Sequence, residues 1–357
     1  MIECIFTLDY EIYGDGTGRL RDLVYEPTAQ LVDVFQRCGV RFVLFVETAG
    51  LSRIEAYQAD AAVDLVKQQV QDLDRAGFEI GLHFHPWWYN AYFQGGKWIL
   101  DHSEYNLCVL PAERISAIVS EAVRYLQSLV ARPDFTPLSY RAGNWLFQPT
   151  EPAATILAQS GICLDSSVFV GGYRHEHRLD YRRIPNGRNF WRFSSDVTRI
   201  DPRGRLIEIP IHAEMVPFWR IAAAKRLALG NALEAGGRGP VGAFHRMRDF
   251  LRFNHPLKLD FCRLSAKQMM AMVRRVSEAE RKKPGPYRPI VAIGHSKDLT
   301  DISAVKTFLE FLIADGVAVA TFRDIYPKLA QAPTLAASTG DSEVALAPEV
   351  PSTGTPR

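Results

Sequence analysis

The segment MIECIFTLDYE, residues 1–11, begins as a short apolar run and ends in acidic residues. Residues 1–8 are rich in Ile, Phe, Thr and Leu, which predicts a buried strand that stops at Asp9. Residues 27–37 carry apolar side chains at helical spacing, Gly39 suits the position after that helix, and RFVLFVE at 41–47 predicts a second strand. Together these segments predict a βαβ unit, in which a helix joins two parallel strands.

The same alternation continues along the chain. Apolar spacing predicts a helix over 61–76 and a strand over 79–84. Further helices are expected at 111–130 and 151–160, and further strands at 138–141, 162–164, 206–211, 290–294 and 317–321. Repeated strands and helices of this length predict an α/β fold with a parallel sheet, open or closed into a barrel. Such sheets carry their chemistry at the carboxyl ends of their strands.

The composition is typical of a folded protein in a reducing compartment. A chain of 357 residues with 47% hydrophobic residues can bury a large core, and a net charge of +2 does not suggest a nucleic-acid partner. The five cysteines form no CxxC pair, so neither a disulfide framework nor a cysteine-based zinc site is expected. The amino terminus does not resemble a signal peptide, so we expect a cytoplasmic protein.

Two stretches depart from the strand and helix alternation. Residues 213–262 include an Ala- and Arg-rich run, which predicts a helical, basic insertion in a barrel that spans 1–330. Such a helix could lie on an anionic membrane surface at the inner membrane face, or form an ordinary solvated face or a dimer contact. Residues 331–357 lack large apolar side chains, so we expect a disordered tail there.

Polar side chains follow several of the expected strands. Because residues two apart in an extended chain face the same side, Asp9 and Glu11 can point one way, as can His83 and His85. Two imidazoles and one carboxylate suit a catalytic divalent ion, most simply Zn²⁺, which lowers the pKa of bound water. A second carboxylate could then act as a base and a later histidine as an acid. Taken alone, each of these pairs is as well explained by ordinary loop residues.

The motifs TLDYE, EIGLHFHPWW, YRAGNW, LDSSV and AIGHSKDL, in that order, resemble those of the polysaccharide deacetylase family, also called the NodB-homology or carbohydrate esterase family 4 group. The resemblance covers residues 1–329, apart from the insertion. It implies a distorted barrel of about seven strands, a (β/α)7-type fold, and metal-dependent removal of an acyl group from an N-acylated sugar.

The resemblance also implies roles for individual residues. Asp9 matches the catalytic base, Arg141 the arginine that orients this base, and His295 the histidine that protonates the leaving amine. Glu11 and His83 match metal ligands. In the LDSS motif, Asp165 matches a residue of the groove or one that supports the catalytic groups.

The histidine spacing departs from the family pattern. The second histidine of the family lies four residues after the first, and Trp87 occupies that position here. His85 is the nearest replacement, either as a ligand or as an aromatic group in the groove, and His102 is a weaker substitute. Another HxH pair, His175 and His177, follows a Gly-Gly pair in an expected loop, and we assign it no metal role.

Aromatic residues near these motifs could offer flat faces to a sugar ring, or could belong to the core. The candidate substrate-binding residues are Tyr10, Trp87, Trp88, Asn144 and Trp145. The sequence therefore predicts a metal-dependent hydrolase that removes an N-acyl group from a sugar or glycan precursor. Two alternatives stay open: a metal-free hydrolase of other C–N bonds on the same fold, and a sugar-binding barrel without catalytic activity.

Overall fold

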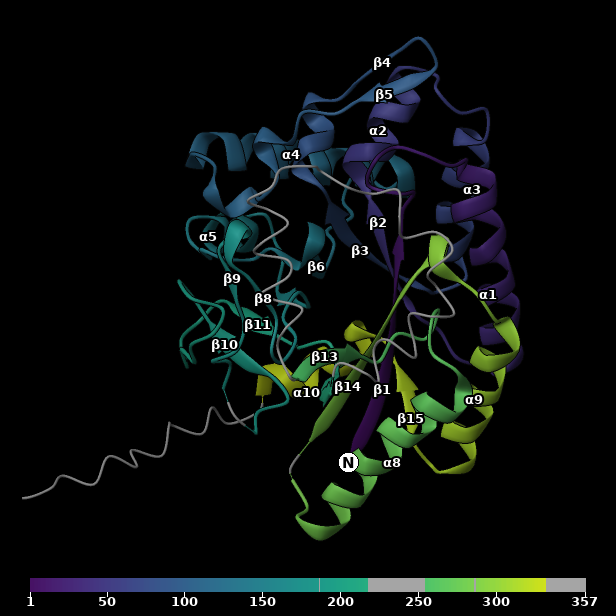
Figure 1. The fold of residues 1–357 in the computed structure, drawn as a ribbon, viewed down its shortest axis with the longest axis vertical. Coiled ribbons are helices and arrows are strands. Elements are labelled where there is room, and N and C mark those ends of the chain that lie inside the picture. Colours follow the sequence, from purple (N-terminus) through teal and green to yellow (C-terminus); the bar gives the residue numbers. More distant parts are fainter. Residues whose placement is uncertain (186, 218–253, 286, 332–357) are drawn as a thin grey trace, which may run out of the picture.

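The computed structural model describes residues 1–185, 187–217, 254–285 and 287–331. Within these ranges a single curved sheet forms the centre of the molecule, in the strand order β10-β11-β7-β6-β3-β2-β1-β14, with β15 pairing to β1 (Figure 1). Its strands are β1 (Ile2–Tyr10), β2 (Val43–Glu47), β3 (Glu79–Phe84), β6 (Ser139–Ala142), β7 (Leu164–Asp165), β10 (Trp191–Phe193), β11 (Leu206–Glu208), β14 (Arg288–His295) and β15 (Ala318–Ala320). All pairs except β10 with β11 are parallel.

The sheet closes on itself through the chain that follows β11. Ile211 forms parallel bridges both with Phe169, which follows β7, and with Val291 of β14. Asp260 forms a further bridge with Ile293. These short contacts join the two sides of the sheet, so the predicted distorted barrel is confirmed, with a closure made of isolated bridges instead of a full strand pair.

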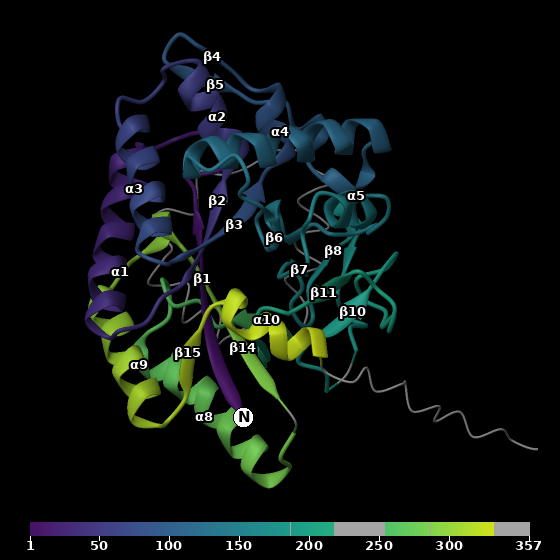
Figure 2. The ribbon, with the colours of Figure 1, turned by 180° about the vertical axis from the view of Figure 1, so that it is seen from behind.

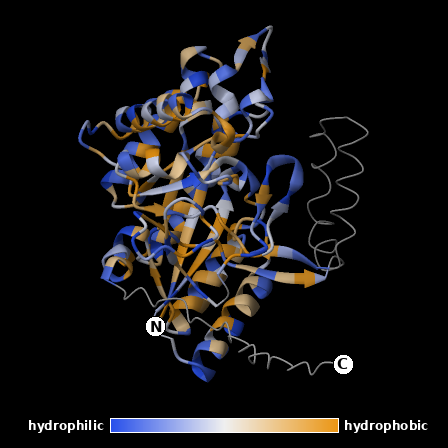
Figure 3. Ribbon diagram, turned by 90° about the vertical axis from the view of Figure 1, so that its left-hand side faces the viewer, coloured by the Kyte–Doolittle hydropathy of each residue, from blue (hydrophilic) through white to orange (hydrophobic). Residues whose placement is uncertain are grey.

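Helices cover the outside of the sheet, and Figure 2 shows α1 and α3 side by side along one side of the molecule. The helices are α1 (Glu26–Arg37), α2 (Thr48–Ala56), α3 (Val63–Arg75), α4 (Ala112–Val130), α5 (Ala153–Gln159), α8 (Ala266–Lys282), α9 (Ile302–Ala314) and α10 (Phe322–Gln331). Pro27 lies in the first turn of α1, where its missing N–H costs nothing, and Leu31 and Phe35 face the core. Hydrophobic residues concentrate in the central strands (Figure 3).

Helix α8 begins at a capping box. The Ser265 side chain accepts a hydrogen bond from the backbone N–H of Gln268, and the Gln268 side chain accepts one from the backbone N–H of Ser265. This reciprocal arrangement satisfies two backbone groups that a helix start leaves without partners. The spacing of apolar residues did not lead us to expect α8, nor α2, α9 and α10.

Three antiparallel hairpins lie outside the main sheet. They are formed by β4 (Tyr92–Gln94) with β5 (Lys97–Ile99), by β8 (Tyr173–Arg174) with β9 (Leu179–Asp180), and by β12 (Ala213–Pro217) with β13 (Asn254–Lys258). The last pair lies near the two ends of the range predicted to be a helical insertion, 213–262, and its strands pair with each other. Most of the expected basic helix falls on 218–253, and the expected tail on 332–357, both outside the described residues.

In the described ranges, every helix is too short or too polar to cross a membrane.

The aromatic core beneath β1 supplies a test of what holds the barrel together. Phe6 is fully buried, and its ring contacts Phe35, Phe261 and Phe308 at centroid distances of 5.0, 5.2 and 5.7 Å. We expect Phe6→Ala to lower the free energy of unfolding by about 3–5 kcal/mol, because it removes apolar contacts and leaves a cavity. Ile313→Ala, at a side chain 52% exposed on α9, should change it by less than about 0.5 kcal/mol. Urea denaturation measures both, and a small loss for Phe6→Ala would contradict this account of the core.

Candidate active site

The polar residues predicted at the strand ends lie together at one edge of the sheet. The strand register pairs Asp9 with His295, and His83 with Glu47 on one side and Arg141 on the other. These five residues come from five strands, all of which run in the same direction. Parallel strands therefore bring to one place side chains that are up to 286 residues apart in sequence, counting from Asp9 to His295.

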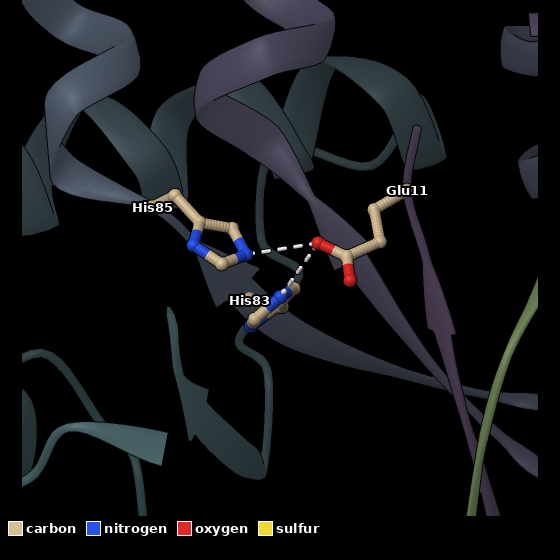
Figure 4. A group of neighbouring side chains, drawn as sticks. All are labelled: Glu11, His83 and His85. Atoms are coloured by element: carbon tan, nitrogen blue, oxygen red, sulfur yellow. Dashed lines mark hydrogen bonds and ion pairs between the residues drawn. The ribbon is translucent and has the colours of Figure 1, made fainter. Parts of the chain in front are cut away.

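Glu11, His83 and His85 form the centre of this site (Figure 4). Oε2 of Glu11 lies 2.9 Å from Nε2 of His85 and 3.4 Å from Nε2 of His83. All three side chains are buried, and each offers an atom within 4.8 Å of the others. The structure thus brings together the three residues expected to bind a metal.

This donor set fits a divalent ion such as Zn²⁺, which prefers imidazole nitrogen and carboxylate oxygen. Nδ1 of His83 lies 2.9 Å from the backbone carbonyl oxygen of Arg141. When Nδ1 carries the proton and donates it to this carbonyl, Nε2 keeps its lone pair, which faces Glu11. Histidines that bind metals commonly have this arrangement. Asp9, Glu11 and His295 form a second such group that shares Glu11.

Asp9 forms a buried ion pair with Arg141. The Arg141 side chain is fully buried, and its Nη1 donates to Oδ1 of Asp9 at 2.6 Å. Its other nitrogens donate to the Thr7 hydroxyl at 2.9 Å and to the Ser166 carbonyl at 2.9 Å, and it stacks on the Phe45 ring. Four contacts thus hold the guanidinium in one orientation, which in turn orients the Asp9 carboxylate.

His295 lies on the other side of Asp9. Its Nε2 is 3.5 Å from Oδ2 of Asp9 and 3.9 Å from Oε1 of Glu11, and its Nδ1 is 3.8 Å from Oδ2 of Asp298. Burial lowers the pKa of His295 to about 4, against the effect of the neighbouring carboxylates. The imidazole is therefore neutral at neutral pH, and a proton that it receives is easily given up.

Lys297 balances the charge of Glu11. Its Nζ donates to Oε1 of Glu11 at 2.9 Å and to the carbonyl of Ile12 at 3.0 Å. Burial raises the pKa of Glu11, but Lys297 and the two histidines outweigh it and hold that pKa well below its usual value. Burial lowers the pKa of His83, yet the hydrogen bond with Glu11 and the negative charge of Asp9 raise it to about 9. The carboxylate at the centre of the site thus stays ionised.

Glu47 supports the backbone at His85. Its two carboxyl oxygens accept hydrogen bonds from the backbone N–H groups of His85, at 2.9 Å, and of Gly50. Burial raises the pKa of Glu47 to about 7, while the nearby positive and donor groups oppose this shift. Sequence analysis did not select Glu47 or Lys297. Glu47 could have been selected because it is a carboxylate at the end of an apolar strand. Lys297 could have been selected because it belongs to the same motif as His295.

Asp165, predicted among the catalytic residues, lies behind Arg141 in the core. Its carboxylate accepts hydrogen bonds from the backbone N–H and hydroxyl of Ser167, and Glu208 lies beside it. Burial raises the pKa of both acids, and their proximity raises that of Glu208 further. The Ser167 hydroxyl oxygen also accepts a hydrogen bond from the backbone N–H of Ala142 in β6, at 2.9 Å. Asp165 is thus placed to hold the loop after β7.

Three aromatic residues predicted to bind substrate are buried. Tyr10 is fully buried because it alternates with Asp9 and Glu11 along the strand, and its hydroxyl donates to Gln69 at 2.6 Å. Trp88 is 2% exposed and packs against Trp98. Neither ring therefore presents an open face at the surface, and the contact of Tyr10 and Trp88 with a substrate stays a prediction.

Trp87 is also 2% exposed and packs against neighbouring rings. Its ring stacks on Tyr105 at 4.8 Å and contacts the His85 ring at 4.3 Å. The contact of Trp87 with a sugar likewise stays a prediction. His85 both packs on this ring and reaches Glu11, so the two roles considered for it are compatible.

Asn144 and Trp145 remain partly exposed at the end of β6. Both have positive φ values, 52° and 60°, in the tight turn that follows Arg141. The Trp145 ring contacts the His295 ring edge-on at 5.9 Å. Of the predicted substrate-binding residues, these two lie where a substrate could reach them.

The other histidines considered lie outside the centre. His102 is exposed and contacts the rings of Trp87 and Tyr105. His175 and His177 occupy a short helical turn next to β8. Among the described residues, these three histidines belong to none of the groups with metal-binding geometry.

Comparison with known proteins relates this fold to solved structures. No protein-family model matches the chain, and no curated protein sequence matches it. The structure is similar to a Mycobacterium smegmatis protein described as a polysaccharide deacetylase, with a TM-score of 0.52, 16% identity and coverage of 92% of this chain and 90% of that one. A Pseudomonas aeruginosa PAO1 protein with the same description has a TM-score of 0.50, 12% identity and coverage of 91% and 90%.

A GH57-type branching enzyme from Pyrococcus horikoshii is similar to the same extent, with a TM-score of 0.51, 12% identity and coverage of 92% of this chain and 70% of that one. At such identities the comparison establishes the fold, which is the NodB-like deacetylase barrel. Because the branching enzyme shares this fold, the reaction has to be argued from the site.

The buried ion pair of the site can be tested through stability. We expect Arg141→Met to lower the free energy of unfolding by about 3–5 kcal/mol, because it leaves the Asp9 carboxylate buried without its partner. The double variant Asp9→Asn with Arg141→Met should recover part of this loss, since it also removes the stranded charge. Urea denaturation of both variants and of Asp9→Asn measures the coupling. Additive losses would show that the pair does not act as a unit.

Proposed function

We propose that this protein is a metal-dependent hydrolase that removes an N-acyl group, such as acetyl, from a sugar or glycan precursor. The observation that carries the proposal is the convergence of Glu11, His83 and His85 next to the Asp9–Arg141 pair and His295. In the proposal Glu11, His83 and His85 hold the ion. A divalent ion at that place supplies Lewis-acid polarisation of the acyl carbonyl and lowers the pKa of water.

The protein's own residues would manage the proton. Asp9, oriented by its ion pair with Arg141, removes a proton from the attacking water. His295 is neutral and has its Nε2 within 3.5 Å of Asp9, so it can accept this proton and pass it to the leaving nitrogen. Glu47 and Asp165 act indirectly, by fixing the backbone of His85 and the loop after β7. Trp145 and Asn144 would contact the sugar.

Further parts of the proposal concern the setting of the reaction. The proposed metal is Zn²⁺, the proposed location is the cytoplasm, and residues 1–330 form one barrel. The basic residues expected between β12 and β13 could bring the enzyme to an anionic membrane surface that carries its substrate.

Metal analysis tests the central claim. Protein purified without chelator should carry a nearly stoichiometric divalent ion, and His83→Ala should lose it because one of three ligands is removed. Asp9→Asn should keep the ion but lose turnover of N-acetylated sugars at least about 100-fold. His102→Ala, at an exposed histidine outside the site, is the matched control and should keep both. Wild-type protein without metal would refute the metal-dependent assignment.

A metal-free hydrolase is the second candidate, and the ion pair between Lys297 and Glu11 favours it, because an ammonium group can itself neutralise the carboxylate. The two candidates differ under chelation. In the metal-dependent case, a chelator abolishes turnover and Lys297→Met retains metal. In the metal-free case, a chelator leaves turnover intact and Lys297→Met removes it, because the positive charge beside Glu11 is lost. Turnover assays on both proteins, with and without chelator, distinguish them.

A further inference from the structure

Lys258 stands out because its charge lies on aromatic rings close to the candidate active site. Its Nζ is 2.8 Å from the centroid of the Trp145 ring and 4.0 Å from that of Phe169. The same Trp145 ring contacts His295 at 5.9 Å. One indole thus separates the lysine from the histidine proposed to protonate the leaving group.

The backbone at Lys258 is held in place from two sides. It is the last residue of β13 and pairs with Ala213 of β12. Two residues later, Asp260 bridges to Ile293 of β14, and the backbone N–H of Phe261 donates to the Ile293 carbonyl at 2.8 Å. The lysine is therefore attached to the strand that carries His295, so its distance from the reaction centre is defined.

The other positive groups of the site have carboxylate partners, and Lys258 does not. Arg141 pairs with Asp9 and Lys297 pairs with Glu11. Within the part of the chain that the structure describes, no carboxylate forms an ion pair with Lys258 or with Arg174 of β8.

The surroundings of Lys258 make this lack of a partner costly. Burial, together with the positive charge of Arg174, holds the pKa of Lys258 well below its usual value. Arg141 adds to this effect, while Asp260 and Asp9 oppose it from too far away to form an ion pair. An anionic group on a ligand that lies over Trp145 would supply the missing partner.

We infer that Lys258, assisted by Arg174, binds a negatively charged group of the substrate, so that the sugar processed here is anionic, with a phosphate or carboxylate near the acylated nitrogen. The inference rests on the proposed function where it names the substrate that is turned over. Binding of an anion at Lys258 does not itself require turnover. The chemistry shared by the two possible groups is an oxyanion that accepts hydrogen bonds from the ammonium and the guanidinium.

Sugars without an amide test the binding separately from the reaction. Calorimetry with methyl glucoside, glucose 1-phosphate and methyl glucuronide compares a neutral, a phosphate-bearing and a carboxylate-bearing probe. The wild-type protein should bind at least one anionic probe about tenfold or more tightly than the neutral one. This preference should weaken with added salt. Which anionic probe binds more tightly identifies the group that the site recognises.

Variants assign the preference to Lys258. Lys258→Met, which keeps the length of the side chain, should remove the preference, and Lys258→Arg should retain most of it. Arg174→Gln, at an exposed position, should weaken it partly and serves as a second test should Lys258→Met fail to fold. Lys306→Met is the matched control, because Lys306 lies exposed on α9 and pairs only with Glu310. Equal binding of all three probes by the wild type, or a preference that survives in Lys258→Met, would overturn the inference.

The same probes in N-acetylated form separate this inference from the proposed function. If no N-acetylated sugar is turned over but charge-dependent binding is seen, the deacetylase proposal fails and the anion site stands. If N-acetylated sugars are turned over with the same kcat/KM whether neutral or anionic, the deacetylase proposal stands and the anion site fails.

Discussion

The buried guanidinium of Arg141 is the contact on which the arrangement of the site depends. It leaves β6, crosses the interior of the barrel and reaches Asp9 and Thr7 of β1, although β3 and β2 lie between these strands in the sheet. It also binds Ser166, after β7, and its own backbone carbonyl meets His83. Arg141 therefore links the ends of four strands, β1, β3, β6 and β7. A charge in such a place is tolerated because each nitrogen of the guanidinium has a hydrogen-bond partner.

The buried acids near this contact differ in whether a cation is bound to them. Arg141 pairs with Asp9, while Lys297 and the two histidines hold the pKa of the buried Glu11 well below its usual value. Asp165 and Glu208 show the opposite solution, since burial without a bound cation raises the pKa of both. Burial also raises the pKa of Glu47, which supports the backbone at His85. These three acids with raised pKa accept hydrogen bonds from backbone N–H groups, whereas Glu11, whose pKa is lowered, pairs with Lys297.

Much of the fold could be predicted from the sequence, because buried parallel strands are continuous apolar runs and their ends carry the polar residues. The strands expected at 1–8, 41–47, 79–84 and 290–294 are present as β1, β2, β3 and β14. A motif shows which residues are near a strand end but not which face they occupy, so the burial of Tyr10 and Trp88 could not be predicted from it. Glu47 and Glu208 were missed because they act on the backbone of other motifs, and such contacts between distant segments leave no local pattern.

The pairing of β12 with β13 also bears on how the barrel is closed. Pro217 and Asn254 are paired across the two strands, so the chain leaves the barrel and returns to it at adjacent points. Ile211, just before β12, and Asp260, just after β13, form the bridges to β14. The hairpin therefore sets the spacing of the two segments that close the barrel.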